Sequence, residues 1–272
     1  MAALIGNSEK GPTLRFSTLS VISPIFAARM AERLVIIPTY NEKENIRDIV
    51  AHVLRLKPEF HVLVVDDGSP DGTAAIVREL MAGSPGRVHL LERKGKLGLG
   101  TAYIAGFKWA LERDYGFVFE MDADFSHAPD DLIRLYAACA EGGADMSVGS
   151  RYVKGGKVSD WAWNRVMLSW CASQYVRAVL WLGVRDTTAG FVCYKAATLR
   201  ALPLNEIKFI GYAFQIEMKY RVKLAGLRIA EVPITFIDRV KGKSKMSANI
   251  FHEAVLGVLK MRFNIKAPER AA

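Results

Sequence analysis

The 272-residue sequence has few cysteines and no uninterrupted apolar run long enough to cross a membrane. Its three cysteines are too few and too scattered for a disulfide framework or a zinc site, and they suit a reducing compartment. The longest mostly apolar segment is 161–182, but Arg165 and Arg177 interrupt it, so an integral membrane protein is not expected. Hydrophobic residues make up 51% of the chain and charged residues 24%, which excludes an intrinsically disordered protein.

Motifs of several common enzyme classes are also missing. The glycine-rich segment 94–106 lacks the Walker A order, Gly98-Leu-Gly100 lacks the third glycine of a dinucleotide fingerprint, and no Gly-x-Ser-x-Gly elbow is present. These glycines are therefore expected to serve helix entry and close packing. The net charge is +9, from 37 Lys and Arg against 28 Asp and Glu. This excess suits solubility or an anionic lipid or nucleotide partner, and no nucleic-acid-binding motif accompanies it.

Strand and helix signals alternate along the chain. Strands are predicted at 34–37, 62–65, 88–91, 117–121, 145–148, 191–194 and 227–236, the last at a sheet edge because Pro233 interrupts it. A capping-box pattern of Asn41 and Glu44 predicts a helix that ends near residue 56, and a second helix is predicted to end near residue 81. Further helices are predicted at 98–112, 129–142, 161–182, 212–224 and 250–263. This alternation predicts an α/β fold with a mostly parallel central sheet and helices on both faces.

Three segments are distinguished by their composition. Residues 1–31 have no clear period and are interpreted as a leader or as the product of a misassigned start. Residues 32–240 are expected to form the main domain, which includes the helix at 161–182. Residues 241–272 are expected to form a basic loop and an amphipathic C-terminal helix, so that amphipathic helices lie at the periphery of the domain.

Acidic side chains follow two of the predicted strands. Asp122 and Asp124 come directly after the strand at 117–121, and ligands of open α/β sheets bind at the carboxyl ends of strands. Their repulsion is relieved by a divalent cation shared with a phosphate, and oxygen ligands fit Mg²⁺ or Mn²⁺. The alternative is a solvated turn at a helix start. Asp66-Asp67 also end a strand, and the glycines, serine and proline that follow them are sufficient to explain a turn. Two acidic strand ends on one rim of the sheet nevertheless favour a nucleotide site.

The segment 161–182 carries a polar stripe. Arg165, Ser169, Ser173 and Arg177 recur every four residues, while the other faces are rich in tryptophan. One interpretation is a core helix whose arginines make ion pairs. The other is a helix that lies on a bilayer and holds a lipid phosphate, because tryptophan prefers the membrane interface and arginine binds phosphate with a planar fork.

Taken in order, several short runs resemble one family. They are Ile37-Pro-Thr-Tyr-Asn-Glu42, Val65-Asp-Asp-Gly-Ser-Pro-Asp-Gly-Thr73, Gly98-Leu-Gly-Thr-Ala-Tyr103, Met121-Asp-Ala-Asp124, Gly149-Ser-Arg-Tyr152, Gly211-Tyr-Ala-Phe-Gln-Ile-Glu217, Glu231-Val-Pro-Ile234, Asp238-Arg239 and Gly242-Lys-Ser-Lys245. Together they cover roughly 33–260 and are similar to the dolichol-phosphate (polyprenol-phosphate) mannosyltransferases, within family 2 of the inverting GT-A glycosyltransferases.

The resemblance implies a GT-A nucleotide-diphospho-sugar transferase fold over 32–240. It further implies inverting transfer of mannose from GDP-mannose to a polyprenyl phosphate, a divalent metal (Mg²⁺ or Mn²⁺) and a role in protein glycosylation. The implied surroundings are an anionic membrane surface on the cytoplasmic face, where the protein is peripheral, and a membrane-protein partner. Two alternatives are a UDP-glucose-dependent polyprenyl-phosphate glucosyltransferase and a non-catalytic basic adaptor at a membrane surface, and the adaptor would have no need of Asp122 and Asp124.

Site residues follow from the resemblance by motif position. The guanosine would be held by Pro38, Tyr40, Glu42, Val65 and Asp67. The ribose, diphosphate and metal would meet Asp122, Ala123 and Asp124, with Asp124 as the main metal ligand and Ser126 as a further one. Phosphates would be clamped by Arg151, Arg239 and Lys245, and the polyprenyl phosphate received by Arg165 and Ser169. The residues expected to act in catalysis are Asp122, Asp124, Arg165, Ser169 and Arg239.

Overall fold

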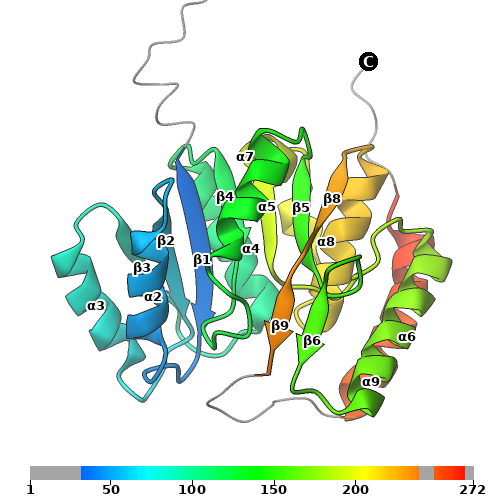
Figure 1. The fold of residues 1–272 in the computed structure, drawn as a ribbon, viewed down its shortest axis with the longest axis horizontal. Coiled ribbons are helices and arrows are strands. Elements are labelled where there is room, and N and C mark those ends of the chain that lie inside the picture. The colour runs from blue at the N-terminus through cyan, green and yellow to red at the C-terminus, as the bar shows by residue number, and fades with distance from the viewer. Residues whose placement is uncertain (1–31, 239–247, 267–272) are drawn as a thin grey trace, which may run out of the picture.

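The computed structural model describes residues 32–238 and 248–266, and a seven-stranded sheet forms its centre (Figure 1). The strands are β1 (Arg33–Thr39), β2 (His61–Asp66), β3 (Val88–Glu92), β4 (Phe117–Glu120), β5 (Met146–Ser150), β7 (Val192–Lys195) and β8 (Ile229–Pro233). Their order is β3-β2-β1-β4-β7-β5-β8, and only β7 runs antiparallel to its neighbours. The prediction of a mostly parallel sheet is therefore confirmed, as is the edge position of the strand that contains Pro233.

Helices cover both faces of the sheet, as predicted. One face carries α2 (Ile46–Arg55), α3 (Thr73–Gly83) and α5 (Asp131–Ala140), and the other carries α4 (Leu99–Leu111), α7 (Ala196–Arg200) and α8 (Tyr212–Leu224). The alternation of side chains along β1 explains this arrangement: Val35 and Ile37 belong to the first apolar core, and Leu34 and Ile36 to the second. A strand that is apolar on both faces is stable only when both faces are covered.

Two further helices lie side by side at one end of the sheet (Figure 1): α6 (Trp163–Leu180) and α9 (Ala248–Asn264). A third apolar cluster joins them to α8 through Val176, Leu180, Tyr220, Val258 and Met261. The helices predicted at 161–182 and 250–263 are thus confirmed to within two residues at each end. None of the helices in the described part of the chain is long and apolar enough to cross a bilayer.

Some local predictions were wrong. Asn41 does not cap a helix: its backbone is left-handed (φ 61°), its N–H donates to Ser69 Oγ (3.0 Å), and α2 begins five residues later after Asn45. The strand predicted at 227–236 is divided at Ile234 into β8 and β9 (Thr235–Ile237). The short elements β6 (Lys157–Ser159), α7 and η1 (Leu204–Glu206) were not predicted, and β6 pairs with β9 in a separate two-stranded sheet.

The glycines of α4 serve close packing, as expected. A β-carbon at Gly100 would lie 2.8 Å from the carbonyl oxygen of Phe209, and one at Gly106 would lie 2.7 Å from Ile36 Cδ1. Both distances are shorter than any ordinary carbon contact, so α4 approaches the loop before α8 and the strand β1 more closely than a side chain would allow.

Candidate active site

The predicted donor residues meet at one edge of the sheet. Strand β1 lies between β2 and β4, with Thr39 opposite Asp66 and Ile36 opposite Glu120. Because all three strands are parallel, their carboxyl ends open onto the same side. The structure therefore brings together three groups from separate motifs: Pro38, Tyr40 and Glu42; Val65 and Asp67; and Asp122, Ala123 and Asp124. Two acidic strand ends on one rim were the expectation from sequence.

The two aspartates after β2 have different roles. Asp66 holds the turn: its carboxylate accepts hydrogen bonds from Thr39 Oγ1 (2.8 Å) and from the backbone N–H of Ser69 (2.9 Å). Asp67 forms a buried ion pair with Arg93 and also accepts the N–H of Leu97 (3.2 Å). The carboxylate of Asp67 thereby fixes the loop after β3 against the rim. Its contact with guanosine stays a prediction.

Asp124 is nearly covered at the end of β4, whereas Asp122 is half-buried. The carboxylate of Asp124 accepts the N–H of Ser126 (3.1 Å) and also the hydroxyl hydrogen of Ser126. In the described part of the chain, no group of three or more His, Cys, Asp and Glu could hold a metal by itself. Mg²⁺ and Mn²⁺ at nucleotide sites take one or two carboxylates and complete their shell with phosphates and water, so the oxygen donors of Asp122 and Asp124 fit such an ion.

A short strand connects this rim to α6. The N–H of Ile237 at the end of β9 donates to the carbonyl oxygen of Ser126 (3.1 Å). The next residue, Asp238, forms an ion pair with Arg165, with 2.8 Å between Oδ2 and Nη1. The predicted acceptor arginine therefore lies beside the predicted metal-binding rim, although the two come from separate parts of the sequence.

Aromatic rings fill the space between the rim and Arg165. His127 packs edge-on against Phe236, with 5.2 Å between ring centroids, and Phe236 packs in the same way against Trp161 (5.2 Å). The guanidinium of Arg165 lies 3.8 Å from the centroid of the Trp161 ring. Stacking on an aromatic face restrains the guanidinium and leaves its edge available for planar recognition of an anion.

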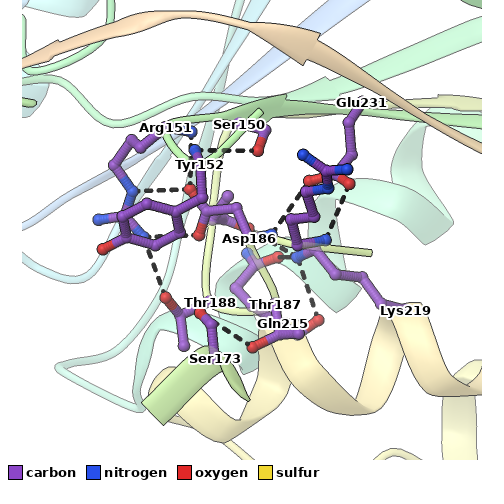
Figure 2. A network of polar contacts seen from close by, with 12 residues as sticks. Ser150, Arg151, Tyr152, Ser173, Asp186, Thr187, Thr188, Gln215, Lys219 and Glu231 are labelled. Carbon is purple, nitrogen blue, oxygen red and sulfur yellow. Dashed lines mark hydrogen bonds and ion pairs between the residues drawn. The ribbon is translucent and has the colours of Figure 1, made fainter. Parts of the chain in front are cut away.

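The polar stripe of α6 turns towards the protein. Ser173 is fully buried and accepts a hydrogen bond from Thr187 Oγ1 (3.4 Å), as Figure 2 shows, while Ser169 is half-buried. The outward face is apolar instead, and its exposed residues are Trp163, Met167, Leu168, Trp170 and, after the helix, Trp181. Elements of both interpretations are present, because the stripe is partly buried, with Ser173 fully covered and Arg165 about one third exposed, while large apolar side chains are left on the surface.

Arg151 is held by a buried carboxylate (Figure 2). Its Nε and Nη2 donate to the two oxygens of Asp186, each at 2.7 Å, and its Nη2 also donates to Thr188 Oγ1 (3.0 Å). Asp186 is fixed in turn, because its N–H donates to Glu231 (3.0 Å). Arg151 therefore lies in a rigid network next to the aromatic rings, 5.5 Å from the Trp161 centroid. A role as phosphate clamp stays a prediction.

A second buried polar network lies under the rim. Glu120 at the end of β4 accepts hydrogen bonds from Gln215 and from Tyr194 Oη (3.0 Å), and Lys219 Nζ donates to the carbonyl of Ala189 (2.7 Å). Burial raises the pKa of Glu120 to about 7 and lowers the pKa of Lys219 to about 8. The contacts of Glu120 fix the end of β4, two residues before Asp122.

Sequence reasoning missed the partners of the arginines. Asp186 and Asp238 carry the contacts that position Arg151 and Arg165, and no motif spacing marked either of them as a partner. Two predicted residues, Arg239 and Lys245, lie outside the described residues.

Comparison with known sequences gives close relatives. The sequence model of the family described as "Glycosyl transferase family 2" matches residues 34–204. The chain is 49% identical to "Polyprenol monophosphomannose synthase" of Mycolicibacterium smegmatis over 225 residues, which are 83% of this chain and 84% of that protein. It is 50% identical to "Undecaprenyl-phosphate mannosyltransferase" of Micrococcus luteus, also over 225 residues, which are 83% of this chain and 91% of that protein.

Solved structures share the fold at low sequence identity. Glucosyl-3-phosphoglycerate synthase from Mycobacterium tuberculosis, in complex with Mn²⁺, uridine diphosphate and glucosyl-3-phosphoglycerate, has a TM-score of 0.63 and 18% identity, covering 97% of this chain and 88% of that one. A structure of the same enzyme with Mg²⁺ and uridine diphosphate has a TM-score of 0.61 and 18% identity, covering 88% and 81%. This likeness confirms the predicted GT-A class of fold.

Proposed function

The chain belongs to glycosyl transferase family 2, and we propose that it transfers mannose from GDP-mannose to a polyprenyl phosphate, with inversion to a β-linked product. The names of the two relatives, each about half identical to this chain over most of its length, support the sugar and the acceptor class. The observation that carries the proposal is the ion pair of Arg165 with Asp238 beside the rim of Asp122 and Asp124. In this arrangement the two aspartates offer a site for a nucleotide diphosphate, and the arginine offers a site for an anionic acceptor.

The donor half of the site has to bind and release a diphosphate. Asp122 and Asp124 supply the carboxylate oxygens for Mg²⁺ or Mn²⁺. When bound, such an ion neutralises the charge that develops on the departing diphosphate. The chain's own contribution is to hold Asp124 in one orientation through Ser126, and to fix the end of β4 through the buried contacts of Glu120. This preorganisation avoids rearrangement when the charge develops.

The acceptor half requires alignment rather than a strong base. A phosphate monoester has a second pKa of about 6, so it is largely dianionic at pH 7 and already nucleophilic. A sugar hydroxyl would need a general base to remove its proton. Arg165, stacked on Trp161, offers a charged planar donor that attracts the dianion and orients it for in-line attack. Ser169, one turn further along α6, would add a hydroxyl donor.

Because the proposed acceptor is a lipid, we expect the reaction to take place at a membrane surface. The outward faces of α6 and α9 expose large apolar side chains, with 73% of Trp163, 71% of Trp181 and 78% of Phe263 accessible to solvent. Arg262 lies over the Trp181 ring at 4.5 Å from its centroid. Exposed tryptophans beside arginines are typical of helices that lie in a bilayer interface without crossing it. We infer peripheral attachment through these two helices, with Arg165 facing the lipid phosphates.

One experiment tests the proposal. Purified protein is mixed with a polyprenyl phosphate, Mg²⁺ or Mn²⁺, and either GDP-mannose or UDP-glucose, and the lipid product is identified by mass spectrometry and NMR. We expect a β-mannosyl lipid from GDP-mannose only, and loss of turnover when a chelator removes the metal. Transfer from UDP-glucose alone would replace the mannose assignment, and the absence of transfer from both donors would overturn the enzymatic proposal.

A further inference from the structure

A small cavity lies along the C-terminal half of α6, outside the residues assigned to donor and acceptor. Its volume is about 230 Å³, and it is lined by Tyr152, Trp170, Gln174, Arg177 and Arg185. Two of these five residues carry a positive charge and none carries a negative charge. The cavity is therefore a cationic recess with two aromatic walls, which suits an anion attached to an apolar body.

The two arginines of this recess differ from Arg151 and Arg165. Those two each pair with a carboxylate, whereas neither Arg177 nor Arg185 makes an ion pair with any of the described residues. Arg177 Nη1 donates to Gln174 Oε1 (2.8 Å), but its Nε is covered from solvent and has no hydrogen-bond partner in the described part of the chain. A covered charged donor without a partner is unfavourable, and an anion in the recess would compensate its charge.

The recess adjoins an apolar groove. Tyr152 and Trp170 also line a second cavity of about 460 Å³, whose remaining walls are Trp161, Trp163, Val166 and Met167. The combined groove is thus apolar towards the N-terminal end of α6 and cationic towards its C-terminal end. This division matches an amphiphile with hydrocarbon at one end and a phosphate at the other.

We propose that Arg177 and Arg185 bind the phosphate of an anionic membrane phospholipid, whose hydrocarbon chains lie along the aromatic groove. The phosphate-binding end of the site is separate from Arg165: Arg177 lies twelve positions further along α6, about 18 Å at 1.5 Å per residue, while Trp161 of the groove also stacks against Arg165. The inference rests on the proposed function only in placing α6 at a bilayer. A phospholipid headgroup and free inorganic phosphate both present a phosphate anion, so the experiment has to distinguish between these two ligands.

The experiment compares vesicle binding by full-length variants of equal net charge. Flotation is measured with phosphatidylcholine vesicles and with vesicles that also contain phosphatidylglycerol, using the wild type, Arg177→Gln/Arg185→Gln and the control Arg55→Gln/Lys108→Gln. The control residues are exposed on α2 and α4, away from α6. We expect the first variant to lose about ten-fold or more of the affinity gained from phosphatidylglycerol, and the control to keep it.

Two further measurements make each outcome decisive. Arg185→Gln alone alters an exposed side chain and is expected to keep the fold. It should lose part of the affinity gained from phosphatidylglycerol, so the site can be tested even if the double variant does not fold. The fluorescence of Trp170 reports titration with inorganic phosphate, with Trp170→Phe as the blank. Equal losses in both double variants, or phosphate binding without a preference for phosphatidylglycerol, would overturn the lipid site. Mannosyl transfer by the wild type is assayed separately, so its absence would count against the reaction and not against this site.

Discussion

Arg165 and Asp238 form an ion pair that joins α6, which we propose holds the acceptor, to the rim that carries Asp122 and Asp124. Their side chains are about one third exposed, 37% for Arg165 and 32% for Asp238, and Nη1 lies 2.8 Å from Oδ2. A pair this accessible contributes about 1 kcal/mol or less to stability. The carboxylate of Asp238 therefore orients the guanidinium while adding little to the free energy of unfolding. A phosphate dianion carries more charge, so we expect it to replace the carboxylate as the partner of Arg165.

The first prediction concerns the acceptor. Arg165→Ala is expected to raise the KM for the polyprenyl phosphate by about 10-fold or more, because a charged hydrogen bond to a phosphate contributes about 1.5–3 kcal/mol. The KM for GDP-mannose should change much less, since we assign Arg165, which pairs with Asp238, to the acceptor and not to the donor. Steady-state kinetics with each substrate varied in turn provides the measurement. Equal changes in both constants would show that Arg165 does not discriminate between the two substrates.

The second prediction concerns the donor. Asp124→Ala is expected to lower kcat by about 100-fold or more, because it removes the proposed main metal ligand, whose ion would neutralise the charge that develops on the leaving group. The fold should be kept, as judged by circular dichroism, since the hydrogen bonds that Asp124 accepts from the N–H and the hydroxyl of Ser126 stay within one turn of the chain. Asp48→Ala, on the exposed face of α2, is the matched control and should leave turnover unchanged. Near-normal turnover of Asp124→Ala without metal would show that the site is elsewhere.

The third prediction concerns stability. Asp186→Asn is expected to destabilise the protein by about 3–5 kcal/mol, because it leaves the guanidinium of Arg151 buried without its charged partner. Glu79→Gln breaks the exposed pair with Arg47 and should cost about 1 kcal/mol or less. Urea unfolding of the two variants measures both values. A similar small loss in each would mean that the Arg151–Asp186 pair is solvated in solution.

Local patterns were sufficient to predict most of the fold and the position of the rim. Buried strands such as β1 and β2 are continuous apolar runs, and the residues after them must lie at the carboxyl edge of a parallel sheet. The pairing of Asp66-Asp67 with Asp122-Ala-Asp124 on that edge follows from this rule without knowledge of any contact. The elements β6 and β9 have three residues each, which is too short for a periodic signal.

Contacts between distant residues were not predictable in this way. Arg151 and Asp186 are 35 residues apart in the chain, and Arg165 and Asp238 are 73 residues apart, so no spacing rule connects them. The orientation of α6 also depends on its neighbours: Ser173 is buried because Thr187 supplies a hydroxyl partner, while the tryptophans stay outside. The sequence left two interpretations of this helix open, a core helix with paired arginines and a helix on a bilayer, and only the tertiary structure shows how far the stripe turns inwards.

The fourth prediction concerns pH. His61 Nδ1 lies 2.8 Å and His89 Nε2 lies 3.3 Å from the hydroxyl of Tyr115, and burial lowers the pKa of both imidazoles. In the unfolded chain each takes up a proton near pH 6.5, whereas in the folded protein it does so only at lower pH. The unfolded state therefore binds more protons in this window, and the free energy of unfolding should fall as the pH drops below about 6.5.

Urea unfolding between pH 5 and pH 8 checks this prediction, with the wild type compared with His61→Gln/His89→Gln. Glutamine keeps a hydrogen-bonding group beside Tyr115 but does not titrate. The stability of the double variant should therefore depend less steeply on pH below 6.5 than that of the wild type, while the remaining slope reports carboxylates and other histidines. Identical slopes for the two proteins would mean that these imidazoles accept protons as readily in the folded state as in the unfolded chain.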